Sequence, residues 1–124
     1  MANTINLSVS LIASAASGTY QQSRQPSVQI NQTNVGASAG IMACTTSYAA
    51  LPLGSVSSAN QGWLYLRNLD NTNNAMVGLN VSATYYPFAQ IQPGEVAVFR
   101  VQPSVTLGLA GTVALNVEYW LLAN

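Results

Sequence analysis

The segment from Gly62 to Gly94 constrains the fold of this chain more than any other stretch. It opens with GWLYLRN, in which residues point alternately to two faces of an extended chain, the pattern of a β-strand with both faces largely covered. The DNTNN that follows favours a turn, because short polar side chains bond their own backbone. Met76 to Val81 is a second extended run, so the sequence predicts a hairpin or two neighbouring strands of one antiparallel sheet.

Extended runs of the same kind lie on both sides of this segment. Pro93 and Gly94 fit a type II turn, and the apolar run Val96 to Val101 behind them predicts a strand covered on both faces. Turn signals at intervals of about 8 to 12 residues are typical of sandwiches and barrels. We therefore predict one all-β domain over residues 1–124, an antiparallel β-sandwich of about eight or nine strands. A jelly roll is the first choice and an immunoglobulin-like sandwich the second. The other stretches that the sequence predicts to be strands include Ile5–Leu11, Ile41–Tyr48, Val105–Leu109 and Val113–Leu121.

Residues 1–50 are patterned less clearly than the rest. Apolar and polar residues alternate from Ile5 to Leu11, which predicts a half-buried first strand. The polar, Gln-rich segment from Gly18 to Asn34 contains Pro26, which limits any central strand there. A surface loop is the favoured interpretation of this segment, and an extended arm that contacts neighbouring subunits is the alternative. The small residues from Gly36 to Gly40 predict a hinge into the next strand.

Ionic side chains are almost absent from this chain. They make up 5% of the residues, and the formal net charge is zero, whereas an average soluble domain is roughly 25% charged. A free monomer normally keeps a charged surface, because neutral surfaces associate. The depletion favours a surface covered by neighbours in a permanent assembly over a small secreted domain with a hydroxyl-rich surface. The charged residues are Arg24, Arg67, Arg100, Asp70, Glu95 and Glu118.

The same depletion argues against several kinds of partner. Three scattered Arg cannot form the basic patch that neutralises phosphates, so we expect no nucleic-acid binding. We expect no membrane insertion, because no apolar run approaches the length of about 20 residues that spans a bilayer. Hard cations require several carboxylates together and soft ones require Cys or His clusters, so we predict no metal site and no cofactor.

Catalysis also lacks its usual groups in this sequence. There is no Lys or His, and the three carboxylates have simpler structural interpretations than an acid and base pair. Cys44 is the single cysteine, in an apolar context that fits a small buried hydrophobe and not a nucleophile. We therefore predict that the protein is not an enzyme and has no catalytic residues.

Two sets of residues are candidates for structural contacts. Arg67 and Arg100 lie within apolar strands, so we expect them to pair with carboxylates or backbone carbonyls, within the chain or across a subunit boundary. The aromatic residues favour core and interface packing, and a sugar-binding surface is the alternative. The predicted ion-pairing set is Arg67, Arg100, Asp70, Glu95 and Glu118, and the interface aromatics are Trp63, Tyr85, Tyr86, Phe88 and Trp120.

Four segments carry a family resemblance: LPLGSV, GWLYLRNLDNTN, PFAQIQPGEVAVFRV and NVEYWLLAN. From Leu51 onward they are similar to small structural proteins of tailed bacteriophages, through turns and strands and not through catalytic motifs. The resemblance implies a virion protein of the capsid surface, synthesised in the host cytoplasm: a decoration or cement protein, typically homotrimeric, that contacts itself and the major capsid protein. The alternative is a phage tail or receptor-binding fibre domain that recognises host glycans.

Overall fold

The structure, a computed structural model, describes residues 3–16, 18 and 21–124. It divides the chain into two compact units, Met1–Thr33 and Asn34–Asn124. Within the described residues, strands dominate, and the helical structure is a single 3-10 turn at Ser58–Asn60. The prediction of an all-β protein is confirmed.

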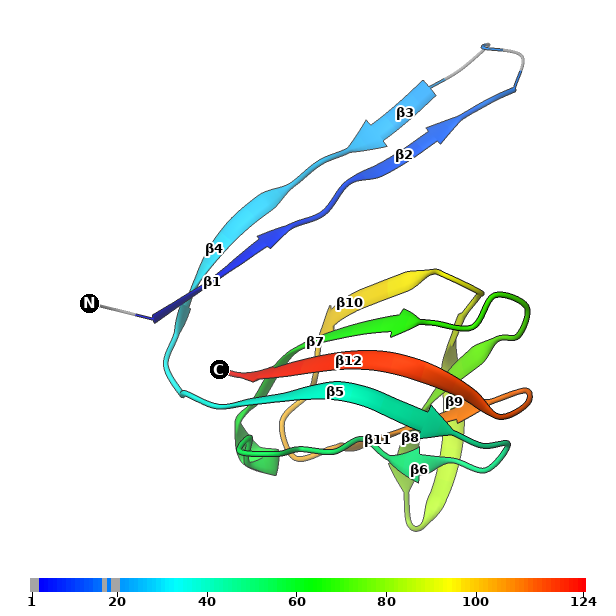
Figure 1. The fold of residues 1–124 in the computed structure, drawn as a ribbon. Helices are drawn as coiled ribbons and strands as arrows, with labels where there is room; N and C mark the ends of the chain where they lie inside the picture. Colours follow the sequence, from blue (N-terminus) through cyan, green and yellow to red (C-terminus); the bar gives the residue numbers. More distant parts are fainter. Residues whose placement is uncertain (1–2, 17, 19–20) are drawn as a thin grey trace. The chain divides into compact units, whose positions relative to one another are not determined.

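The first unit is a two-stranded antiparallel ribbon (Figure 1). Strand β1 pairs with β4 near the base of the ribbon and β2 with β3 toward its tip, and between them the Val9 amide donates to the Pro26 carbonyl at 3.0 Å. The surface loop expected from Gly18 to Asn34 is wrong, because β3 and β4 occupy most of that segment. The bounds are β1 Asn3–Ser8, β2 Leu11–Ser14, β3 Gln21–Arg24 and β4 Ser27–Gln32.

The lower half of the ribbon is amphipathic. Ile5 lies opposite Ile30 and Leu7 opposite Val28, and residues directly opposite each other in a ladder share one face. The pairs between them consist of Ser, Thr, Asn and Gln. Strand β2, farther along, is exposed over its whole length. A two-stranded ribbon has no second layer of its own against which to bury apolar residues, and an isolated one is marginally stable at best.

The second unit, residues 34–124, is a sandwich of two four-stranded antiparallel sheets (Figure 1). Sheet 1 has the order β10-β7-β12-β5 and sheet 2 the order β6-β11-β8-β9. The chain changes sheet at every connection except β8 to β9, and this strand order is that of a jelly roll, as predicted. The bounds are β5 Ala37–Cys44, β6 Ala49–Ala50, β7 Gln61–Asn68, β8 Ala75–Val81, β9 Thr84–Ile91, β10 Val96–Arg100, β11 Thr106–Gly111 and β12 Leu115–Ala123.

The extent of the sandwich differs from the sequence prediction. The described residues form twelve strands, eight in the sandwich and four in the ribbon, so the total exceeds the eight or nine predicted. The sandwich begins at Asn34 and not at residue 1. The hinge expected from Gly36 to Gly40 is largely strand β5, where the absence of a Cβ at Gly40 leaves room for the Tyr119 ring on the neighbouring strand.

Strands β7 and β8 do not form the predicted hairpin, because they belong to opposite sheets. Asn68, fully buried at the end of β7, organises the crossing. Its Nδ2 donates to the carbonyls of Asn73 at 2.8 Å and Ile91 at 3.0 Å, and its Oδ1 accepts from the Asp70 amide at 3.0 Å. These bonds tie the loop after β7 to the end of β9 in sheet 2, so one buried amide joins both sheets.

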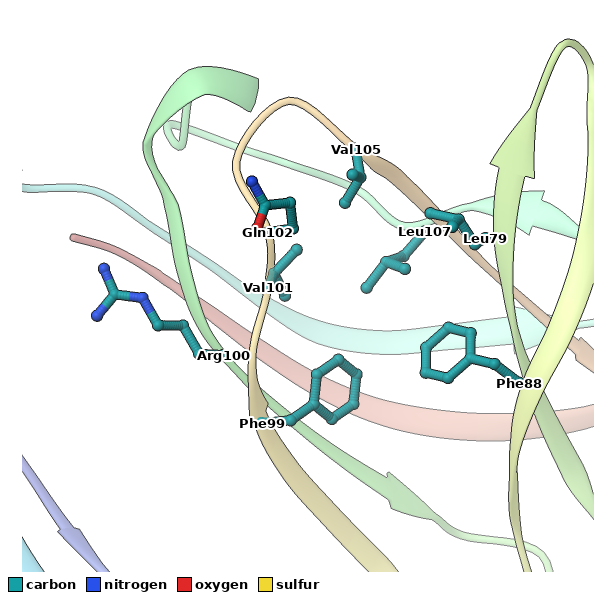
Figure 2. A pocket seen from close by; sticks show the side chains of 8 residues that line it. All are labelled: Leu79, Phe88, Phe99, Arg100, Val101, Gln102, Val105 and Leu107. Carbon is teal, nitrogen blue, oxygen red and sulfur yellow. The ribbon is translucent and has the colours of Figure 1, made fainter.

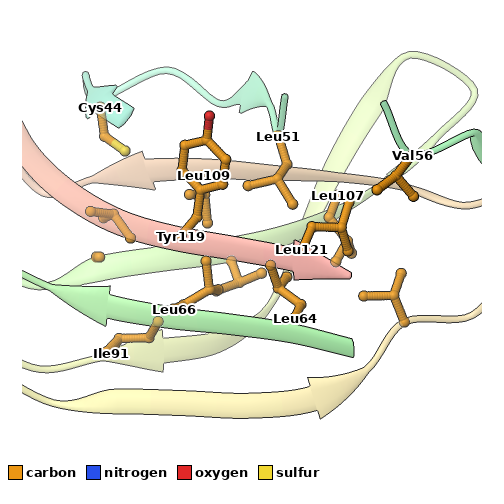
Figure 3. Packing of buried hydrophobic residues seen from close by; sticks show 14 of the residues in the cluster. Cys44, Leu51, Val56, Leu64, Leu66, Ile91, Leu107, Leu109, Tyr119 and Leu121 are labelled. Carbon is orange, nitrogen blue, oxygen red and sulfur yellow. The ribbon is translucent and has the colours of Figure 1, made fainter. Parts of the chain in front are cut away.

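The core lies between the two sheets (Figure 3). Strand β12 supplies it with every second residue, as the sequence alternation predicts. Cys44 is one of the core residues, and burial raises the pKa of its thiol, which keeps the sulfur protonated. The largest fully buried apolar side chains are Leu64, Leu66, Val77, Leu109, Val117 and Leu121.

Candidate functional site: an apolar sheet face and an open sheet edge

The face of sheet 1 that points away from sheet 2, here called the outer face, is apolar and exposed. Ile41 is 63% exposed, Val96 58%, Trp120 51% and Val98 40%. These side chains alternate with the core residues of their strands, so the same periodicity that builds the core also builds this face. The outer face consists of Ala39 and Ile41 of β5, Trp63, Tyr65 and Arg67 of β7, Val96, Val98 and Arg100 of β10, and Glu118, Trp120 and Leu122 of β12.

A small polar cluster lies in the middle of the outer face. The register places Glu118 directly opposite Arg67 and Trp120 directly opposite Tyr65. Burial raises the pKa of Tyr65, a hydrogen bond to Glu118 raises it further, and Arg67 lowers it. The Tyr65 phenol therefore interacts with both the Glu118 carboxylate and the Arg67 guanidinium. These two opposite charges face each other across the ladder, which limits the cost of covering this part of the face.

The other predicted ion-pairing residues lie away from this cluster. The Asp70 carboxylate accepts from the amides of Thr72 at 2.7 Å and Asn73 at 2.6 Å, and these bonds lower its pKa. The Glu95 carboxylate accepts from the Gln92 amide at 3.0 Å within the turn before β10. Both acids thus stabilise turns. Ion pairing of Arg67, Arg100 and the three acids stays a prediction.

The predicted aromatic residues do not gather into one surface. Trp63 and Trp120 lie on the outer face of sheet 1. Tyr85 belongs to sheet 2, where its ring stacks on Tyr48 with centroids 5.2 Å apart. Tyr65 was not among the predicted interface aromatics, although its position two residues after Trp63 in an alternating run places both side chains on one face.

Phe88 and the exposed Tyr86 belong to β9, at the edge of sheet 2. Phe88 makes an edge-to-face contact with Phe99 of β10, with ring centroids 6.1 Å apart. An apolar cleft of about 350 Å³ opens beside these rings, here called the edge cleft. Figure 2 shows the two rings turned toward the cleft and the Arg100 guanidinium pointing away from it. The lining residues are Leu79, Phe88, Phe99, Arg100, Val101, Gln102, Val105 and Leu107.

Strand β10, next to the edge cleft, is an edge strand of sheet 1, and among the described residues no strand pairs with its outer side, here called the open edge. The Asn68 amide donates to the Glu95 carbonyl at 3.0 Å, and the Val101 amide donates to the Gly62 carbonyl at 2.7 Å. Backbone groups alternate in direction along an antiparallel strand, so the amides of Val96 and Val98 point outward. The prediction that this strand is covered on both faces is wrong for the single chain, because its outer-face valines are exposed.

The described residues do not assemble a metal site. No three His, Cys, Asp or Glu side chains come together there in a way that would hold a metal ion. The part of the chain that the structure describes contains no helix with the length and apolar character to cross a bilayer. The comparisons with protein-family models, curated proteins and solved structures find no match to this chain. What the described residues do show is an exposed apolar sheet face, an edge strand and an apolar cleft beside it.

Proposed function

We propose that this chain is a structural protein that acts by non-covalent association, and specifically a capsid decoration or cement protein of a tailed phage. In this role it binds copies of itself, as a homotrimer, and the major capsid protein on the head surface. The observation that carries the proposal is the outer face, on which Ile41, Val96, Val98 and Trp120 are exposed in a chain with 5% charged residues.

Burial of apolar area supplies the energy for this function. Each Å² of apolar surface removed from water contributes about 25 cal/mol, and a stable interface buries about 1,600 Å² in total. The outer face carries three charged side chains, and two of them, Arg67 and Glu118, lie opposite each other, which lowers the cost of removing them from water. Attachment at many sites on a shell adds avidity without any chemical step.

The strand order gives a second, weaker support. Jelly rolls form viral capsid domains, and they also form lectin domains. Because one fold serves many functions, the topology is consistent with the proposal and does not define it. The phage-like segments from Leu51 onward all fall within the sandwich, which is the unit that carries the outer face.

Sedimentation of the purified full-length protein tests self-association. We expect a trimer, and a protein that stays monomeric at high concentration contradicts the proposal. Binding to phage heads that lack this protein tests the capsid contact. We expect Trp120→Lys, which places a charge on the outer face, to weaken head binding at least about tenfold. The matched control is Val113→Lys, a 42% exposed valine in the turn between β11 and β12.

One observation favours glycan recognition as a second candidate function. Trp120 and Tyr65 lie side by side in register, with Arg67 and Glu118 next to them, and aromatic planes beside hydrogen-bonding groups suit a sugar ring. Glycan-array binding that Trp120→Ala abolishes and Tyr86→Ala preserves would favour this function. Electron microscopy of virions separates the two, because a cement protein covers the head and a fibre domain lies at the tail.

A further inference from the structure

We propose that strand β2 of one copy adds to the open edge of strand β10 in a second copy, and that side chains of β2 fill the edge cleft there. This inference rests on the proposed self-association and identifies the two segments that make it. Addition of a strand to a sheet edge is a common mode of protein recognition, in which backbone hydrogen bonds supply affinity and pockets for alternate side chains supply specificity.

The acceptor is an unprotected edge. Sheet edges that avoid pairing usually carry Lys, Pro or a bulge. Strand β9, the neighbouring edge of sheet 2, contains Pro87 and a register irregularity opposite Val77 and Gly78. Strand β10, Val96–Arg100, has no Pro or Lys, and its ladder with β7 is regular. The backbone amides of Val96 and Val98 point away from β7, so they can donate hydrogen bonds to an added strand.

The donor has complementary properties. Strand β2 has the sequence LIAS, without charge or Pro, and it pairs with β3 along one edge. Leu11 is 68% exposed and Ile12 is 53% exposed. Neither side chain is buried within the two-stranded ribbon, so each would lose apolar area to water on docking.

The edge cleft fits the side chains that such a strand presents. Its lining is almost entirely apolar, and apolar cavities offer water no hydrogen-bond partners. In an added strand, successive side chains point to opposite faces. Leu11 and Ala13 therefore share one face and Ile12 takes the other. One face would enter the cleft next to Phe99, while the other would extend the outer face beside Val98.

The proposed self-association makes a second copy the acceptor. Each copy carries both parts of the contact, the exposed strand β2 and the edge strand β10, so the same contact can repeat from copy to copy. Exchange of arms from copy to copy is a heterologous contact, which forms a ring such as a trimer when the rotation between copies closes.

A proline at the acceptor edge tests the inference. The Val98 amide points outward, so Val98→Pro removes a donor from the open edge and leaves the ladder between β10 and β7 intact. We expect this variant to be monomeric by light scattering. Val98→Thr, which keeps the amide and the branched side chain, should remain oligomeric. Ile12→Lys should dissociate the oligomer from the donor side, and Val113→Lys should leave it intact.

Amide hydrogen exchange supplies an independent readout on the full-length protein. In the wild-type oligomer we expect slow exchange at Val98, and at least tenfold faster exchange in Ile12→Lys. If Val98→Pro does not fold, as judged by circular dichroism, Val98→Lys replaces it. An oligomer that survives these variants, with fast exchange at Val98, overturns the inference and leaves the proposed function standing. A wild-type protein that is monomeric overturns self-association itself.

Discussion

The sandwich and the ribbon are built from the same alternating sequence pattern, but only the sandwich buries its apolar residues within one chain. In the sandwich, every second residue of β12 enters a core between two sheets. In the ribbon, β2 is exposed along its whole length. Alternation therefore specifies a strand, whereas burial requires a second layer. For the ribbon, we propose that another molecule provides that layer.

The largest expected effect is the loss of a core side chain. Leu66 is completely buried between the sheets, so Leu66→Ala should lower the free energy of unfolding by about 2–5 kcal/mol. Ile12→Ala in the ribbon should change the unfolding of the sandwich by less than about 0.5 kcal/mol. Urea denaturation of both variants, measured under monomeric conditions, checks the contrast. Equal losses would show that ribbon and sandwich unfold as one unit.

The buried amide at the sheet crossing should come next. Asn68→Ala removes three hydrogen bonds and leaves two carbonyls and an amide to be solvated, which should cost about 2–4 kcal/mol. The nearby exposed Asn71 is a matched control, and Asn71→Ala should be close to neutral. Denaturation midpoints give the comparison. A neutral Asn68→Ala would mean that the loop between the sheets holds its shape without this side chain.

In sheet 2, Gly78 leaves room for the ring of Tyr48, which stacks on Tyr85. A Cβ at Gly78 would lie 2.7 Å from the ring of Tyr48, so Gly78→Ala should destabilise the sandwich by about 1–3 kcal/mol. Tyr48→Phe should be neutral or slightly stabilising, because the buried hydroxyl has no hydrogen-bond partner among the described residues. Thermal unfolding of the two variants separates ring packing from the hydroxyl group. Equal losses in both would contradict this assignment.

The smallest effect that we predict is a loss of folding stability at low pH. The pKa of Asp70 is below its ordinary value of 3.8 because amides donate to its carboxylate. A lowered folded-state pKa stabilises the native state above the unfolded-state pKa, and this stabilisation is lost as the pH falls through the folded-state value. Stability should therefore decline below about pH 4, and Asp70→Asn should decline less steeply. Melting temperatures from pH 2 to 6 test this, and identical slopes would exclude a role for Asp70.

Local signals located most of the sandwich strands. The alternating run after Gly62 became β7, and the Pro93-Gly94 turn connects β9 to β10 with Gly94 at a φ of 74°. The same signals misplaced the partner of β7, because a turn cluster does not encode which sheet the next strand joins. That choice depends on Asn68, because its buried side-chain amide donates a hydrogen bond to the carbonyl of Ile91, a residue far along the chain.

The candidate site was partly visible in the sequence. Charge depletion predicted an associating surface, and Trp63 and Trp120 were among the residues named for it. Tyr65, Ile41 and Val98 were not, because their exposure depends on which strands pair side by side. The open edge of β10 was invisible for the same reason, since an apolar run gives no sign of whether its strand is central or at an edge.

The sequence alone determined that this protein is made of short strands and that its surface carries few ions, because periodicity and composition are local properties of the chain. Tertiary structure decided the jelly-roll order, the exposed outer face of sheet 1 and the open edge beside the edge cleft. These features depend on contacts between residues far apart in the sequence, and the face of a strand that is buried is fixed only when a second layer packs against it.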